Sequence, residues 1–322
     1  MTFFFSHRSQ KALRRVVCVA AGLFAACATP IHAADTPAAE ANLAFRQAVA
    51  EASHGADVVG AFYRDRGYRP IFTGEEPDDR VRRTALIRAL QSAPSHGLPA
   101  DRYRADDLLA LFAGAQTLRA RGRAEVEAAK LFLAYADDIS AGVLEPKRLG
   151  LAIPRDLPRR EPAALLAGLA GGDPVGFLRG IAPQSHEYNR LRAERLRLER
   201  ILATGGWGAK VPAGKLSPGE AGPGVVALRD RLIAKGYLER SASASYDAAL
   251  TDAVQRFQLD HGLEADGVAG AETIAAVNAP VEARLQAVLV AMERERWLNL
   301  PGSKGARHVF VNLTDFSAKI VD

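Results

Sequence analysis

The chain offers few residues for nucleophilic or metal chemistry. Its two cysteines, Cys18 and Cys27, both lie near the N-terminus, so no later residue can act as a thiolate nucleophile or a thiolate metal ligand. His186-Glu187 begins like the zinc motif H-E-x-x-H, but Arg190 stands where the second histidine ligand is needed. We therefore predict no metal ion and no cofactor.

Serine chemistry also lacks its usual patterns. After residue 33 no serine is followed three residues later by a lysine, and no G-x-S-x-G elbow occurs. P-loop and dinucleotide-binding fingerprints are absent as well. A carboxylate-based hydrolase stays open, because it needs only two acidic side chains at a set separation and the chain has 37 acidic residues.

The N-terminus reads as an export signal. An apolar run at residues 16–28 is too short to span a bilayer, and small residues lead to a cleavage site after Ala33 or Ala34. The basic residues that precede the run are Arg8, Lys11, Arg14 and Arg15. We predict a signal peptide at 1–33 and a periplasmic protein with no membrane span after cleavage. An uncleaved anchor and a lipoprotein acylated at Cys27 are the alternatives, although Phe24-Ala25-Ala26 departs from a lipobox.

Cleavage changes the charge of the chain. Residues 1–33 hold four basic and no acidic side chains, so the formal net charge falls from +5 to +1. The basicity of the full sequence therefore does not indicate a nucleic-acid partner. A hydrophobic content of 48% with 25% charged residues is typical of globular domains, and 322 residues leave room for about two of them.

Apolar periodicity predicts a helical domain over residues 34–203. Residues 190–202 show it best, with Arg195 interrupting the apolar face and expected to extend its head to solvent. Residues 125–139 repeat the pattern, whereas 63–72 are expected to form a loop or a short extended piece.

A second, smaller domain follows. Residues 204–222 are rich in glycine and proline and predict a linker, in which Trp207 packs onto a domain surface. Helices are expected at 225–235, 246–260 and 272–278, which gives a three-helix domain over 223–279.

The last segment changes from helix to strand. Within residues 280–306 a connecting helix is expected at 281–298, with a solvated polar end at 293–296. In residues 307–322 two strands alternate around a turn at Thr314-Asp315, and a lone hairpin is marginal in water. We therefore expect the sequence to end inside a β-domain. The predicted fold is mainly α, with a C-terminal β-hairpin that begins a truncated β-domain.

The segment 246–278 resembles the second half of a peptidoglycan-binding domain of type 1. Its marks are Ala253-Val254, Phe257-Gln258, Gly262-Leu263, Asp266-Gly267, Gly270 and Thr273, preceded by Leu228-Arg229, Leu232 and Gly236-Tyr237-Leu238. Because exposed aromatic and amide groups suit sugar faces and peptide amides, we predict that Tyr246, Gln258 and Asp266 contact peptidoglycan.

The rest of the chain resembles the large periplasmic L,D-transpeptidases. The marks are Phe62-Tyr63, Arg66, Tyr68-Arg69-Pro70, His96-Gly97-Leu98-Pro99, Tyr103, Tyr135, Asp138, Gly142, Pro146, Gly205-Gly206-Trp207, Arg294, Arg296-Trp297 and Val311-Asn312. The resemblance implies a helical scaffold domain and the start of a catalytic β-domain. It also implies a cysteine acyl-enzyme that forms 3→3 cross-links, yet no cysteine follows Cys27 and His308 matches no catalytic position.

Three functions follow from these observations. The first is the scaffold and wall-binding portion of an L,D-transpeptidase, with no catalytic residue in this sequence and inactive alone. The second is a non-catalytic peptidoglycan-binding protein of the envelope, and the third is a carboxylate-based wall hydrolase. The expected partners are glycan strands and stem peptides, with other wall-synthesis proteins as further partners.

Overall fold

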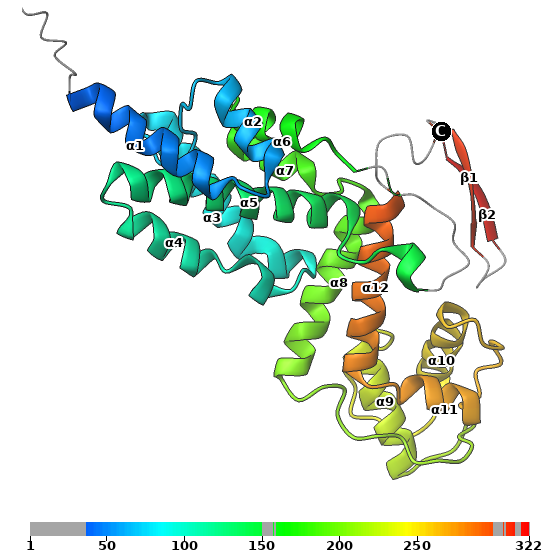
Figure 1. Cartoon of the computed structure of the whole chain (residues 1–322). Coiled ribbons are helices and arrows are strands. Elements are labelled where there is room, and N and C mark those ends of the chain that lie inside the picture. The colour runs from blue at the N-terminus through cyan, green and yellow to red at the C-terminus, as the bar shows by residue number, and fades with distance from the viewer. Residues whose placement is uncertain are drawn as a thin grey trace, which may run out of the picture.

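The computed structural model describes residues 37–149, 157, 159–298, 305, 307–312 and 317–321. The predicted signal segment, Cys27 and the turn at Thr314-Asp315 lie outside them. The fold is mainly α, as predicted: the described residues form twelve α-helices and, after them, one antiparallel pair of strands (Figure 1). Among these residues no single helix is long and apolar enough to cross a membrane, and α11 with α12, bent by 77°, reaches that length and composition only as a pair.

The helical part of the molecule is built around one long helix, α5 (Leu118–Ala141). The side chain of Thr117 caps its start by accepting from the backbone of Ala120, and the helix ends at Gly142, whose φ is 94°. Around it lie α1 (Pro37–Ala52), α2 (Asp57–Asp65), α3 (Pro77–Ser92), α4 (Ala105–Gly114), α6 (Pro162–Leu169), α7 (Pro174–Ile181) and α8 (His186–Ala203). Short 3-10 turns add η1 (Ala93–His96), η2 (Ala100–Tyr103) and η3 (Pro146–Leu149).

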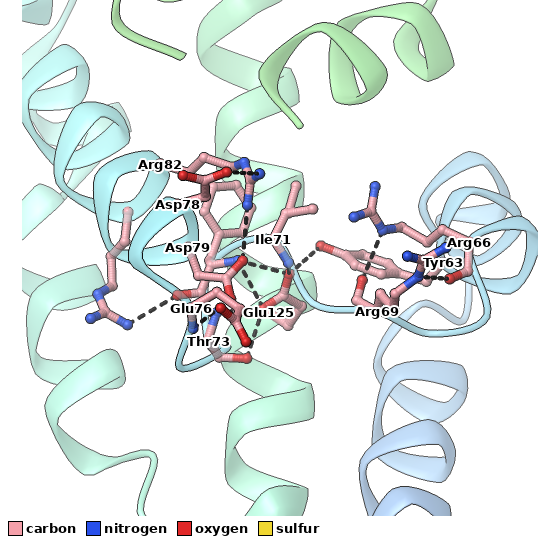
Figure 2. Close-up of polar contacts among 12 residues, drawn as sticks. Tyr63, Arg66, Arg69, Ile71, Thr73, Glu76, Asp78, Asp79, Arg82 and Glu125 are labelled. Carbon is pink, nitrogen blue, oxygen red and sulfur yellow. Dashed lines mark hydrogen bonds and ion pairs between the residues drawn. The ribbon is translucent and has the colours of Figure 1, made fainter. Parts of the chain in front are cut away.

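A buried carboxylate anchors α5 to the segment that precedes α3 (Figure 2). Glu125 has no exposed surface and accepts hydrogen bonds from five donors. These are the Tyr63 hydroxyl at 2.8 Å, the backbone amides of Ile71, Phe72 and Thr73, and the Thr73 hydroxyl at 2.7 Å. Burial, followed by the charge of Glu125, raises the pKa of Tyr63 well above its ordinary value, so the phenol stays a donor. The backbone amides of residues 71–73 are thus bonded to one side-chain carboxylate and not to the backbone carbonyls of a helix or sheet.

The loop before this anchor explains several marks of the sequence. Helix α2 reaches Asp65, so only the later part of 63–72 is a loop. Arg66 Nε donates to the carbonyl of Arg69 at 2.8 Å, and Arg69 Nε donates back to the carbonyl of Arg66 at 3.3 Å. Tyr68 adopts a φ of 61°, a conformation that an ordinary side chain rarely takes, and the Arg46 guanidinium lies 4.9 Å from the centre of its ring.

The smaller domain is a three-helix unit with its own core, which we call the module. It comprises α9 (Pro223–Lys235), α10 (Ala248–Asp260) and α11 (Ala271–Val277). Its core includes Leu228, Leu232, Leu250, Val254 and Phe257, all without exposed surface. The predicted helices and their apolar faces are therefore observed.

The segment predicted as a linker holds no helix, yet its second half is bound to the module. Val211 is buried and exchanges two hydrogen bonds with the amide side chain of Asn278. Leu216 pairs with Ala269 as an isolated β-bridge. Arg231 of α9 donates to the carbonyls of Gly208 and Ala209. The module is therefore fastened to its entering chain from about residue 208 onward.

Helix α12 (Val281–Leu298) leaves the module and returns along α8 to the helical part (Figure 1). The pair is antiparallel, because Tyr188 at the start of α8 meets Arg296 near the end of α12, while Leu198 and Val281 share a cluster at the other end. Trp207 is buried in that cluster and packs onto the domain surface as predicted.

Two sequence-based expectations about polar residues on this helix pair are wrong. The end of α12 is not a solvated face, because Glu293 and Arg296 are 7% and 1% exposed and pair with each other. Arg195 does not extend to solvent, since it is 5% exposed and its guanidinium is paired with Glu199. In both cases an ionic partner one turn away makes burial tolerable.

The strands β1 (His308–Asn312) and β2 (Ser317–Val321) pair antiparallel, with His308 opposite Val321 and Asn312 opposite Ser317. The alternating pattern therefore predicted the strands correctly. Val309, Val311 and Ile320 are all more than half exposed.

Candidate functional site

The predicted ligand-binding residues meet around one loop of the module, residues 266–270, and the first turn of α11. The Gln258 amide, on α10, donates to Asp266 Oδ1 at 2.8 Å, to the Val268 carbonyl at 3.0 Å and to Thr273 Oγ1 at 3.1 Å. Its oxygen accepts from the backbone amide of Gly267 at 3.0 Å. The side chain therefore holds the loop to α10.

The other two residues complete this loop. The Tyr246 hydroxyl donates to the carbonyl of Gly267 at 2.8 Å, and burial raises the pKa of this phenol. Asp266 accepts from the backbone of Val268, and that bond with the one from Gln258 lowers the pKa of its carboxyl. Gly267 has a φ of 74°, and a Cβ there would lie 2.8 Å from a methyl group of Thr251. The turn thus needs glycine.

The expected exposure of these residues is wrong for two of the three. Tyr246 and Gln258 are each 2% exposed, because the loop saturates their polar atoms internally. Asp266 is exposed at the surface of the loop. Contact of Asp266 with a ligand stays a prediction. Tyr246 and Gln258 hold the loop in place by hydrogen bonds from its buried side.

Replacing Gln258 with leucine is expected to destabilise the module by about 2–3 kcal/mol. The reason is that Gly267 N, the Val268 carbonyl and the Thr273 hydroxyl lose a buried partner together. Urea unfolding followed by circular dichroism measures the change. Leu259→Gln is the matched control, since Leu259 is 67% exposed and its replacement is expected to cost less than about 0.5 kcal/mol. Equal losses in the two variants would contradict a structural role for the amide.

A groove that the sequence reasoning missed lies where the module meets α8 and α12. It has a volume of about 330 Å³, and Lys235, Tyr237 and His261 line it on the module side. Arg284 of α12 and Trp207 line the other side. Lys235 Nζ lies 4.2 Å from the centre of the Trp207 ring. Gly236-Tyr237-Leu238 is one of the family marks. Apolar periodicity alone could not show that Lys235 and Tyr237 face α8 and α12.

The groove carries excess positive charge. Burial, then the nearby charges of Arg284, Arg231 and Arg197, lower the pKa of Lys235 from 10.5 to about 8. Arg197 is paired with Glu194, but no ion pair engages Lys235 or Arg284 among the described residues. A cationic groove beside aromatic rings suits a ligand that combines carboxylates with sugars or amides.

A second set of family marks converges far from the module, where α12 meets α5 and α8. Arg296 donates to Glu293 at 2.6 Å, to the carbonyl of His96, and to the Tyr188 hydroxyl at 3.3 Å. Glu293 also accepts from the backbone of Leu144 at 2.7 Å. The group is buried and its charges are paired, so it joins the helices and presents no free reactive group.

Further marks lie beside this cluster. The Tyr103 hydroxyl donates to Asp138 at 2.6 Å, and Arg102 Nε lies 2.7 Å from the same carboxylate. A Cβ at Gly142 would lie 2.7 Å from the indole nitrogen of Trp297, so the close approach of α12 to the end of α5 requires glycine. Gly142 and Trp297 therefore record how α12 docks, whereas Tyr103 and Asp138 join η2 to α5, and none of these marks contributes a nucleophile.

Comparison with known families matches two separate stretches of the chain. Residues 57–194 match the scaffold domain family, which covers α2 to the middle of α8. Residues 221–277 match a peptidoglycan binding domain, which covers α9 to α11 and includes all three predicted ligand residues. The chain thus joins a scaffold domain to a peptidoglycan-binding domain, and both predictions are confirmed. The comparison with curated proteins gave no match. Within the described residues no group of three or more metal-ligating side chains occurs.

Proposed function

We propose that this chain is the scaffold and wall-binding portion of a periplasmic L,D-transpeptidase. The observation that carries the proposal is the order of the two domains. A scaffold domain precedes a peptidoglycan-binding domain, as in the family that the sequence resembles. The helix after the module, α12, carries the marks Arg296-Trp297, which dock it onto the scaffold. The proposal assigns the chain no catalytic residue, because no cysteine follows Cys27.

Within the proposal, the module binds glycan strands and stem peptides, and the groove at its junction takes stem-peptide carboxylates. Three features support this role for the groove: its unpaired cations, its aromatic walls and its position on the matched domain. The exposed Asp266 loop supplies a polar surface next to the same helices.

Deleting residues 223–279 is expected to abolish retention of the protein on purified sacculi. The deletion removes α9 to α11 and leaves residues 204–222 to connect α8 with α12. Co-sedimentation with sacculi measures retention, and circular dichroism checks that the remaining helices are folded. Retention that is unchanged in a folded variant would overturn wall binding by the module.

Retention is expected to weaken as the pH rises above about 8. Lys235 is charged below its lowered pKa of about 8 and neutral above it, whereas the wall carboxylates stay ionised. Its contribution to binding is therefore present below pH 8 and lost above it. Co-sedimentation from about pH 7 to about pH 9 measures the change. In Lys235→Arg the charge persists over this range, so its retention should stay flat, and a flat curve for the unmodified protein would exclude this contact.

The transpeptidase assignment has its own test. The protein is purified from its native envelope fraction, its intact mass is measured, and a carbapenem is added. A covalent adduct on the native protein supports the enzyme, whereas a native protein that is retained on sacculi and forms no adduct is a non-catalytic wall-binding protein.

A further inference from the structure

The scaffold contains a cavity of about 540 Å³ that lies outside the module and its groove. It opens between α3, α7 and α8, with one wall from α5. Each helix contributes residues at helical spacing, for example Ala85, Ala89 and Arg88 from α3 and Val175, Leu178 and Arg179 from α7. A volume of this size is typical of small-molecule sites.

The charge of this cavity is one-sided. Arg88, Arg179 and Arg192 reach it from three different helices, and among the residues that the structure describes no aspartate or glutamate lines it. In the described part of the chain Arg88 and Arg179 have no side-chain ion pair or hydrogen bond. Arg192 makes long contacts with Ser95, at 3.5 Å to its carbonyl and 3.4 Å to its hydroxyl. Like charges that share a cavity repel one another, so an anion bound there would stabilise the folded protein.

His96 adds a neutral donor to the same wall. The Tyr188 hydroxyl accepts from Arg296, so its own proton is available to His96 Nδ1, 3.1 Å away. This places the imidazole hydrogen on Nε2 of a ring that lines the cavity. Burial, then the charges of Arg192, Arg296 and Arg195, lower the pKa of His96 to about 3, so the ring stays neutral.

One side of the cavity is apolar, whereas Ser92, Gln184 and Asn189 add neutral polar groups elsewhere in its lining. Leu178, Ala182 and Pro183 are buried and form one side of the cavity. An anion that binds here therefore carries a small apolar body, and its oxygens face the guanidinium groups.

We propose that this scaffold cavity binds a small ligand in which a carboxylate or phosphate group is attached to a short apolar body. Both groups present paired oxygens that fit the guanidinium fork, so they share one recognition chemistry. The proposal does not depend on wall binding, because none of the residues involved belongs to the module or its groove.

Calorimetric titration of the full chain tests the proposal with three probes. N-acetyl-alanyl-alanine carries a free carboxylate, its C-terminal amide lacks one, and n-propyl phosphate carries a phosphate. We expect saturable binding of at least one anion and none of the amide. Which anion binds more tightly identifies the source of the oxyanion.

Variants then locate the binding. Arg88→Gln combined with Arg179→Gln should weaken it at least about tenfold, since two charge-assisted contacts are lost. Arg190→Gln is the matched control, because Arg190 is exposed on α8 and does not line the cavity. Both substituted arginines are exposed, so without ligand the double variant should unfold at the same or a higher temperature. Absence of binding by both anions, or equal binding by the double variant, would overturn the proposal.

Discussion

Replacing Glu125 with alanine is expected to destabilise the scaffold by about 3–5 kcal/mol. The fully buried carboxylate accepts from five donors, so its removal leaves the Tyr63 hydroxyl, three backbone amides and the Thr73 hydroxyl unpaired. A change of this size is expected to lower the melting temperature by roughly 10 °C in a domain of this length. Thermal unfolding followed by circular dichroism measures it.

A neighbour on the same helix provides the control for Glu125. Glu127 lies two residues further on α5 and pairs with Lys130 at the surface. Glu127→Ala is therefore expected to cost less than about 1 kcal/mol. Glu125→Gln keeps one acceptor oxygen but points an amide group at the donors, so it should fall between the two. A loss for Glu125→Ala no larger than that for Glu127→Ala would show that the segment 71–73 does not depend on this carboxylate.

Replacing Arg296 with methionine is expected to have an effect of similar size, about 3–5 kcal/mol. Methionine fills much of the space but leaves the buried carboxylate of Glu293 without its partner. The carbonyl of His96 and the Tyr188 hydroxyl lose a donor at the same time. Because these contacts join α12 to α8 and η1, amide hydrogen exchange in α12 should accelerate along with the loss of stability.

The two partners of this ion pair allow a stricter test. Glu293→Gln with Arg296→Met removes both charges, so the double variant should lose less stability than the sum of the single variants. Arg294→Met is the control, because Arg294 is the exposed neighbour on the same helix. If Arg296→Met and Arg294→Met have equal effects, α12 is held by its apolar contacts alone.

Apolar periodicity predicted the helices and the core of the module, because residues such as Leu250, Val254 and Phe257 report their own burial through their spacing. The same pattern could not place the buried polar groups. Arg296 bonds to a carbonyl 200 residues away, and Tyr63 to a carboxylate 62 residues away. Such partners come together only in the folded chain. The local sequence therefore gives no sign that these polar side chains are buried and paired.

One signal in the sequence was available and missed. Glu125 precedes Ala128, Ala129 and Phe132 at helical spacing, so it falls on the buried face of α5 and not opposite it. An acidic residue on an apolar stripe predicts an internal partner. The same reasoning separates Gln258 from its exposed neighbour Leu259, since Gln258 continues the face formed by Val254.

The pairing of α8 with α12 has a mechanical consequence. A module connected to the scaffold by one flexible segment would move freely under force. Here α8, which precedes the module, and α12, which follows it, lie side by side, so both helices would bear a force exerted by the wall. To move the module away from the scaffold, α12 has to shear along α8, which strains the Leu198–Val281 contacts and the Arg296 cluster at opposite ends of the pair. Tension in the sacculus would therefore be transmitted to the scaffold through the packed helix pair α8 and α12.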